Sequence, residues 1–269
     1  MNKNSKIALV TGGSRGIGRN SAIALSKKGI DVIITYNNQK EKADQVVEEI
    51  EANGGKAAAI HLNVSEVSSF DSFISKLSGV LKDKWNQEHF DFLINNAGIS
   101  NHTPILEVTE EEFDKIVNIH FKGVFFLTQK LIPLIADKGG IVNTSTGLTR
   151  FTSPGSGLYA AAKGAVEVFT RYLAVELGAR GIRVNTIAPG AVNTEFSGDT
   201  YIKNPGLKDI IGSHAALGRI GEASDIGGVV ASLCTDEMGW VTNVAEFFAS
   251  DLSSFVSGQH LLISGGALR

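Results

Sequence analysis

A tyrosine and a lysine four residues apart are the pair in this sequence best suited to proton chemistry. Tyr159 and Lys163 enclose the run "YAAAK" inside a mostly apolar stretch of helical length. Residues i and i+4 lie on one face of a helix, so this phenol and this ammonium can share one cleft. A free phenol has a pKa of about 10, and a nearby positive charge stabilises its phenolate. The pair could act as a general acid/base, although a core tyrosine beside a snorkelling lysine has the same spacing.

A glycine-rich loop near the N-terminus could bind an anion. The segment "TGGSRGIG", Thr11 to Gly18, lies between a short apolar run and a stretch of helical length rich in Ala, Ser and Leu. At such a turn the free backbone N–H groups and the helix dipole both favour an anion such as a pyrophosphate. The glycine spacing differs from the Gly-x-Gly-x-x-Gly dinucleotide pattern, so the loop alone could also be an ordinary turn.

The end of the second apolar run bears on the choice of cofactor. An acidic residue about 20 residues beyond the glycine loop usually binds the ribose hydroxyls of NAD. Here that place holds Tyr36 and Asn37, and the first carboxylate is Glu41. A 2′-phosphate would meet no repulsion there, and Arg15 and Lys40 could approach it. We predict a preference for NADP(H) over NAD(H), the alternative being that both cations are solvated surface charges.

Five segments in one order and spacing give the sequence a resemblance to the short-chain dehydrogenase/reductase family over nearly its whole length. They are "TGGSRGIG", "NNAG" (95–98), Asn118 in "IVNIHFKG", "YAAAK" and "PGAVNT" (189–194). The resemblance implies hydride transfer between a nicotinamide and a carbonyl substrate, with Tyr159 as the acid/base. It implies that Lys163 lowers the pKa of the tyrosine and holds the nicotinamide ribose, and that Asn118 anchors a water relay to that lysine.

The resemblance also implies a set of cofactor-binding residues. The segment 95–98 resembles the turn that lines the adenosine pocket, and 189–194 the segment that meets the nicotinamide carboxamide. Asn63 stands where the family usually carries an aspartate, and its amide can still contact the adenine. The full expected set is Gly12, Ser14, Arg15, Gly16, Ile17, Gly18, Tyr36, Asn37, Asn63, Val64, Asn96, Ala97, Gly98, Tyr159, Lys163, Pro189, Gly190, Val192 and Thr194.

The family's carbonyl-orienting serine is replaced in this chain. That serine stands thirteen residues before the tyrosine, where this sequence has Thr146, with Ser145 beside it. Neighbours on a strand point to opposite faces, so only one of the two can face the cleft, and the spacing favours Thr146. A threonine hydroxyl donates the same hydrogen bond, in a pocket tightened by its methyl group.

Short apolar runs rich in β-branched residues alternate with amphipathic stretches of helical length. This alternation predicts one doubly wound, Rossmann-like α/β domain over residues 1–269, with a mainly parallel seven-stranded sheet covered by helices on both faces. Ligands in such sheets bind beyond the carboxyl ends of the strands. The predicted strands are 7–11, 31–36, 56–62, 91–95, 140–145, 182–188 and 260–264.

Composition excludes several other classes of protein. The 269 residues carry a net charge of -3 without a cluster of basic residues, which argues against a nucleic-acid partner. The single cysteine, Cys234, cannot form an internal disulfide, and this suits the cytoplasm. The longest apolar run near the N-terminus is too short to span a membrane. The six histidines show no metal-ligand spacing. A small-molecule carbonyl or alcohol partner and no metal are therefore expected.

The helix that carries the pair has two apolar stripes, and one stripe suffices to pack on a sheet. Val166, Phe169, Leu173 and Leu177 form one stripe, and Ala165, Val168, Tyr172 and Val175 form the other. The second stripe predicts a homo-oligomer, a dimer or a tetramer, as the resembled family commonly forms. The alternative is a helix buried within its own chain.

Two further segments are singled out by their composition. Residues 195–217 are polar and glycine-rich and follow the expected nicotinamide segment, which suits a substrate lid. Residues 233–243 and 247–258 echo one another, so 233–258 is either a local duplication or a coincidence between two loops.

The sequence favours an NADP(H)-dependent oxidoreductase that interconverts a ketone and a secondary alcohol. Its substrate could be a 3-oxoacyl thioester or a sugar, steroid or xenobiotic carbonyl. The alternative is a regulator that binds the dinucleotide on the same fold without turnover.

Overall fold

A six-stranded parallel sheet forms the centre of the protein, in a computed structural model that describes residues 5–198 and 204–242. The strand order β3-β2-β1-β4-β5-β6 confirms the predicted doubly wound, Rossmann-like domain. The predicted strand at 260–264 and the second half of the echo at 233–258 lie outside the described residues. The six strands are β1 (Ile7–Val10), β2 (Asp31–Tyr36), β3 (Ala57–His61), β4 (Phe90–Asn95), β5 (Ile135–Thr144) and β6 (Arg183–Ile187).

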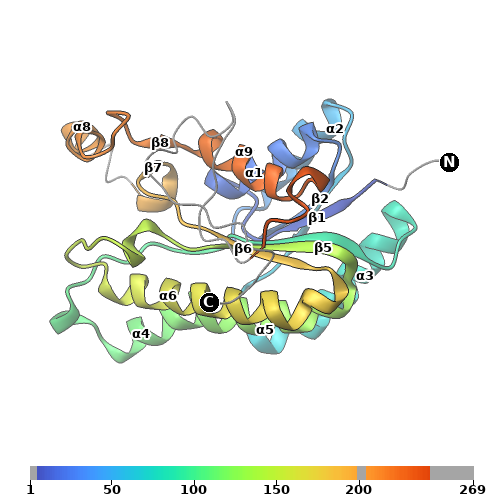
Figure 1. Ribbon diagram of the computed structural model, residues 1–269, viewed down its shortest axis with the longest axis horizontal. Coiled ribbons are helices and arrows are strands. Elements are labelled where there is room, and N and C mark those ends of the chain that lie inside the picture. Colours follow the sequence, from blue (N-terminus) through green and yellow to red (C-terminus); the bar gives the residue numbers. More distant parts are fainter. Residues whose placement is uncertain (1–4, 199–203, 243–269) are drawn as a thin grey trace.

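Helices cover both faces of this sheet (Figure 1). One layer contains α1 (Gly16–Lys27), α2 (Lys40–Ala52) and α9 (Ala223–Leu233). The other layer contains α3 (Phe70–Val80), α5 (Gly123–Leu131) and α6 (Gly157–Leu177), and α4 (Glu110–Val117) lies beside α6. No helix of the described residues is long and apolar enough to cross a membrane.

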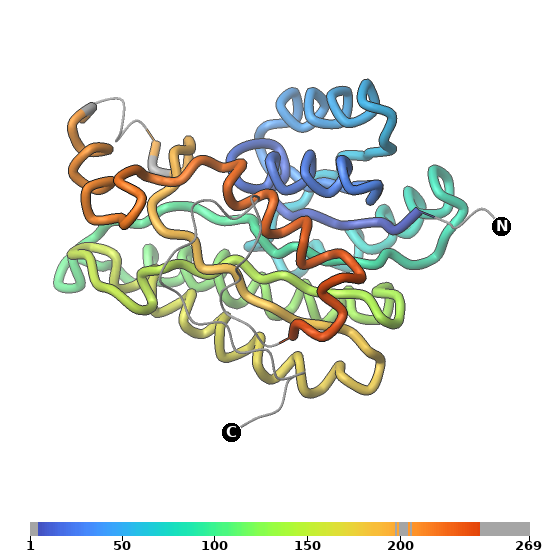
Figure 2. The backbone as a smooth tube through the Cα atoms, turned by 45° about the horizontal axis from the view of Figure 1, so that its top comes forward, coloured from blue at the N-terminus to red at the C-terminus, as the bar shows by residue number. Residues whose placement is uncertain are grey.

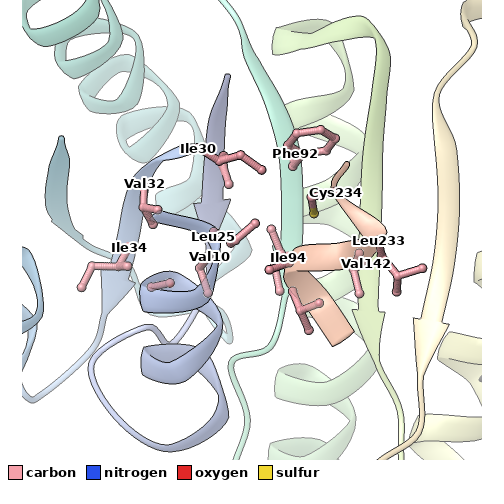
Figure 3. Close-up of a cluster of buried hydrophobic side chains, with 14 of the residues drawn as sticks. Val10, Leu25, Ile30, Val32, Ile34, Phe92, Ile94, Val142, Leu233 and Cys234 are labelled. Atoms are coloured by element: carbon pink, nitrogen blue, oxygen red, sulfur yellow. The ribbon is translucent and has the colours of Figure 1, made fainter. Parts of the chain in front are cut away.

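The strands are apolar on both sides because both sides are covered. In β1, Ala8 and Val10 pack toward α1 and α9, whereas Ile7 and Leu9 pack into the opposite layer. Figure 3 shows the first of these two clusters, with Val10 between strands and helices. The alternation of side chains along each strand therefore builds two cores on one sheet.

Strand β5 is longer than the sequence predicted. It begins at Ile135, five residues before the predicted start at 140, and its pairing with β4 shifts register between Phe90 and Phe92. Lys138 lies within this irregular stretch in the left-handed region, with φ 65°. A polar "ADKGG" stretch does not resemble a buried strand, and only its pairing with β4 reveals it.

The carboxyl ends of β1, β4, β5 and β6 all open onto the same edge of the sheet. A two-stranded sheet of β7 (Val192–Asn193) and β8 (Gly221–Glu222) follows β6, and α8 (Pro205–Ser213) precedes β8. Figures 1 and 2 show these three elements at the end of the molecule where α6 begins. This edge brings together the loops in which most of the predicted site residues lie.

Candidate active site

Helix α6 carries Tyr159 and Lys163 on one face, as their spacing predicted. The lysine is only 3% exposed, and its Nζ donates a hydrogen bond of 2.6 Å to the carbonyl oxygen of Thr144 at the end of β5. That Nζ lies 5.9 Å from the centre of the Tyr159 ring. The ammonium is therefore fixed beneath the phenol by the last residue of the central strand.

Thr146 meets the tyrosine from the loop after β5. Its backbone is extended, and its Oγ1 accepts a hydrogen bond of 3.3 Å from the backbone N–H of Leu148. The Thr146 side chain lies near enough to Tyr159 to lower the pKa of its phenol. Since its oxygen accepts from Leu148, its own O–H is available to donate. A donor and a phenol thus face the same point at the edge of the sheet.

Ser145 points away from this cleft. Its Oγ donates to Glu167 Oε1 at 2.6 Å, and the Thr149 hydroxyl donates to the same oxygen at 2.8 Å. Ser145 is buried against α6, where its Oγ also donates to the Lys163 carbonyl oxygen at 3.4 Å. The two neighbours therefore have different surroundings, with Thr146 at the phenol and Ser145 at the Glu167 carboxylate.

Burial dominates the titration of both members of the pair. It raises the pKa of Tyr159 to about 12, against which the hydrogen bond from Thr146 acts to lower it. Burial lowers the pKa of Lys163 to about 8. In the protein without nucleotide, desolvation of the phenolate is the largest influence on the pKa of Tyr159, and the lowering of that pKa by Lys163 stays a prediction.

His120, which the sequence analysis did not select, contacts Tyr159 from the same turn that contains Asn118. Its ring packs edge-on against Tyr159 with the ring centres 5.0 Å apart, and its Nε2 lies 2.8 Å from the carbonyl oxygen of Ile99. Burial, and then the charge of Lys163, lower the pKa of His120 to about 3, so the ring is neutral at physiological pH. A Cβ added at Gly98 would lie 2.7 Å from its Cε1.

No hydrogen bond joins Asn118 directly to Tyr159 or Lys163 within the described residues, and its expected relay role, which runs through water, stays a prediction. Residues Asn118–Lys122 form a π-helical turn between α4 and α5. Such a turn holds an extra residue and changes which side chain faces inward. The only sequence signal for His120 was a polar ring in an otherwise apolar run.

The segment after β4 holds the glycine loop in place. Asn96 Nδ2 donates to the carbonyl oxygens of Thr11 and Gly12 at 2.9 and 3.2 Å. The Thr11 Oγ1 in turn accepts from the backbone N–H groups of Asn96 and Ala97 at 2.9 and 3.0 Å. The "NNAG" segment therefore supports the loop that was expected to bind the pyrophosphate.

The glycines of that loop leave no room for side chains. A Cβ at Gly18 would lie 2.3 Å from the carbonyl oxygen of Gly12, and one at Gly13 would lie 2.6 Å from Ile34. Gly12 and Gly16 adopt left-handed backbone angles, with φ 65° and 55°.

The start of α1 is also open to an anion. No side chain caps its first turn, and that turn contains no acidic residue, whereas Thr109 caps α4. An uncapped N-terminus behind a close-packed glycine turn fits the pyrophosphate of a dinucleotide. Ser14 is buried within this loop and Ile17 is half-buried.

At the end of β2, half-buried Tyr36 and exposed Asn37 stand beside the place expected for the adenosine. Asn63 is engaged within its own loop, since its Oδ1 accepts from the Ser65 hydroxyl at 2.8 Å and its Nδ2 donates to Glu66. The Val64 side chain is half-buried beneath the loop after β4.

The cations predicted for a 2′-phosphate have different partners. Arg15 lies 3.1 Å from Glu195, and Lys40 lies 2.6 Å from Asp44 on its own helix. Lys42, which was not predicted, also binds Glu195, at 2.8 Å. The sequence does not show that Lys42, on α2, lies close to Arg15, because only the fold brings these two elements together.

The segment 189–194 borders the opposite side of the cleft. The Pro189 carbonyl oxygen accepts from the Gly147 N–H at 2.9 Å, which ties this segment to the Thr146 loop. Gly190 is exposed and Val192 is buried in β7. Thr194 lies next to the glycine loop, since a Cβ added to Gly16 would lie 3.6 Å from its side chain.

Comparison with known proteins places these features in context. A family model described as Enoyl-(Acyl carrier protein) reductase matches residues 12–245. An uncharacterized oxidoreductase of Methylorubrum extorquens is 38% identical over 238 residues, covering 88% of this chain and 93% of that protein. The 3-oxoacyl-[acyl-carrier-protein] reductase FabG of Staphylococcus aureus is 35% identical over 266 residues, covering 98% of both.

A solved structure is similar over the same length. The angucycline C-6 ketoreductase LanV with bound NADP matches with a TM-score of 0.84 and 34% identity, covering 89% of this chain and 92% of that one.

Proposed function

The chain belongs to the short-chain dehydrogenase/reductase family, and from that premise we propose that it is an NADP(H)-dependent reductase of apolar ketones, with Tyr159 as the general acid/base. The observation that carries the proposal is the position of the Tyr159 ring 5.9 Å from the buried Lys163 Nζ, with Thr146 near enough to lower the pKa of the phenol. Three residue types suited to carbonyl chemistry converge beside a glycine loop suited to a dinucleotide.

In the proposed reaction, bound NADPH supplies a hydride to the carbonyl carbon. The Thr146 hydroxyl donates a hydrogen bond to the carbonyl oxygen and orients it. Tyr159 gives its proton to that oxygen as the alcohol forms, and takes a proton back in the reverse direction. Lys163 provides a fixed positive charge beneath the phenol, which favours the phenolate that the transfer leaves.

The surroundings of the cleft support an apolar substrate. Phe196 lies with its ring centre 6.1 Å from that of Tyr159. Ile105 packs on Gly157 at the start of α6, where a Cβ added to the glycine would lie 3.1 Å from its side chain. Phe151 packs on Gly147, next to Thr146, where an added Cβ would lie 2.5 Å from its ring. All three of these apolar side chains are at least 41% exposed. An exposed apolar group of this kind is typical of a ligand-binding rim.

Two substrate classes fit such a rim. The similarity to the Staphylococcus aureus reductase supports a 3-oxoacyl thioester, and the similarity to LanV supports a polycyclic ketone. We extend the lid hypothesis for 195–217 to the choice between them, because Phe196 from this segment is the ring beside Tyr159.

The cofactor proposal is a preference for NADP(H) over NAD(H). It rests on the position of Arg15 at the start of α1 and on the lack of a carboxylate at the end of β2. A ratio of kcat/KM values that favours NADH would contradict it.

The deciding experiment follows NADPH oxidation against a panel of 3-oxoacyl thioesters and polycyclic ketones. Tyr159→Phe removes only the phenolic oxygen and is expected to abolish turnover while NADPH still binds. Tyr172→Phe is the matched control, since Tyr172 lies on the same helix with 67% of its surface exposed and is expected to retain activity. Binding of NADPH with no turnover on any ketone would instead favour the non-catalytic regulator.

We also propose that the protein is a homo-oligomer, joined through the second apolar stripe of α6. Val168, Tyr172 and Val175 are exposed by 44%, 67% and 52%. Val168 and Tyr172 border a groove of about 510 Å³ whose walls include Phe121 and Phe125. A second copy of the same helix would cover this surface.

A further inference from the structure

Two basic side chains from different elements converge on one carboxylate at the edge of the glycine loop. Arg15 precedes α1 and Lys42 lies in the first turn of α2. The Glu195 Oε2 lies 3.1 Å from Arg15 Nη1 and 2.8 Å from Lys42 Nζ, and the Glu195 Oε1 lies 2.9 Å from the same Nζ. The two cations, 27 residues apart in the sequence, therefore form one anion site.

Glu195 is directed into this site by its own backbone. It opens a single 3₁₀ turn whose preceding residue, Thr194, accepts a hydrogen bond from the Phe196 N–H. Thr194 itself lies 3.6 Å from a Cβ built on Gly16. The carboxylate thus approaches the glycine loop from the segment after β7.

Two cations stabilise the Glu195 carboxylate in its ionised form. Hydrogen bonds from Lys42, and then from Arg15, lower the pKa of Glu195 below its usual value. All three side chains are between 38% and 57% exposed, and ion pairs of that exposure contribute at most about 1 kcal/mol each. The carboxylate is therefore held weakly enough for a stronger anion to replace it.

A phosphate is such an anion. It carries a charge of about -1.5 to -2 at neutral pH and three acceptor oxygens, whereas a carboxylate carries one charge and two oxygens. Lys40 pairs with Asp44 one turn along its own helix and not with the carboxylate that Arg15 contacts. Lys42 and not Lys40 is the lysine that shares an anion with Arg15.

We propose that Arg15 and Lys42 together bind the 2′-phosphate of the dinucleotide, and that Glu195 occupies their site in the free protein as an internal competitor. Lys42 then determines cofactor specificity, and Glu195 weakens the binding of phosphorylated cofactors alone. The inference rests on the NADP(H) preference proposed above. It adds a second cation to the site and a carboxylate that the phosphate must displace.

The test is a calorimetric titration of NADPH and NADH into the unaltered protein and three variants, with no substrate present. Lys42→Met is expected to raise the dissociation constant of NADPH by about tenfold, the loss of one charge-assisted contact, and to leave that of NADH within about twofold. Glu195→Gln is expected to lower the dissociation constant of NADPH by about three- to fivefold, with NADH again unaffected. Lys40→Met is expected to leave both constants within about twofold.

Each contrary result has a separate meaning. If the unaltered protein binds NADPH no more tightly than NADH, the cofactor preference and this inference both fall. If NADPH is preferred but Lys42→Met does not weaken it, or Lys40→Met weakens it instead, only the assignment of Lys42 is overturned. If Glu195→Gln weakens NADPH, the carboxylate assists binding and the competitor role is wrong.

Discussion

At the scale of single residues, desolvation decides the proton chemistry of the cleft. Tyr159 and Lys163 are each shifted by burial toward their neutral forms, to pKa values of about 12 and about 8. Thr146 opposes this shift at Tyr159, since its hydroxyl lowers the pKa of the phenol by favouring the phenolate. The neutral phenol is the form that gives a proton to a carbonyl oxygen, so the free protein is set for reduction.

Replacing the two neighbouring hydroxyls should separate their roles. Thr146→Ala is expected to lower kcat by about 100-fold or more, because it removes the donor to the carbonyl oxygen. It should also move the basic limb of the alcohol-oxidation profile to higher pH, since the Tyr159 pKa loses the group that lowers it. Ser145→Ala, which breaks a contact with Glu167 and a 3.4 Å contact with the Lys163 backbone carbonyl oxygen, is expected to cost much less. Steady-state kinetics in both directions measure this, and the reverse order would contradict the placement of Thr146.

The buried ammonium of Lys163 should reduce stability. Its folded-state pKa of about 8 lies below the unfolded value of 10.5. The unfolded state therefore binds more protons between these values, and stability should rise with pH across that window. The shift corresponds to about 3 kcal/mol at neutral pH.

The variant Lys163→Met should remove this penalty. It is expected to raise the free energy of unfolding at pH ~7.5 by about 1–3 kcal/mol, to lose the rise toward pH ~9.5, and to lose activity. Urea unfolding of the protein without nucleotide, at both pH values, checks this. A variant less stable than the unaltered protein at neutral pH would show that the Thr144 hydrogen bond outweighs desolvation.

At the scale of elements, the glycine turn before α1 depends on close contact with the segment after β4. Gly18→Ala would place a methyl group 2.5 Å from Asn96 Nδ2 and 2.3 Å from the Gly12 carbonyl oxygen. We expect NADPH affinity to fall by at least about tenfold, because the loop must move away from its supporting amide.

A glycine elsewhere provides the matched control for that change. A Cβ at Gly79, an exposed position in α3, would meet nothing within 4 Å. Gly79→Ala should therefore leave NADPH affinity unchanged and raise stability by about 0.5–1 kcal/mol. Nucleotide titration and urea unfolding of both variants make the comparison. Equal NADPH affinities in the two would show that the loop tolerates a side chain.

At the scale of the whole molecule, the two stripes of α6 have different surroundings. Val166, Leu173 and Leu177 are buried in the sheet-facing core, whereas the stripe that includes Val168 and Tyr172 faces outward. Among residues 5–198 and 204–242, one apolar face of this long helix thus has no covering partner.

A charge placed on the outward stripe should separate the subunits. Val168→Asp is expected to convert a dimer or tetramer to a smaller species, because it buries an unpaired carboxylate in the proposed interface. Light scattering gives the mass of each. Glu111→Lys on α4, an exposed site whose charge is also changed, is the control and should leave the mass unaltered. A monomeric unaltered protein would contradict the oligomer proposal.

The sequence by itself determined the sheet and the order of the motifs. Six of its seven predicted strands are present, because a sheet covered on both faces requires apolar β-branched runs that are visible in the sequence. The spacing of Tyr159 and Lys163 likewise set their common face, since helical periodicity is local.

Only the tertiary structure decided which side chains surround that pair. A π-helical turn brings His120 against Tyr159, and burial is the largest influence on the phenol pKa. The convergence of Lys42 and Glu195 on Arg15 joins three elements that are distant in the sequence. Such contacts depend on helix register, desolvation and the crossing of separate chain segments, and none of these is a local property of the sequence.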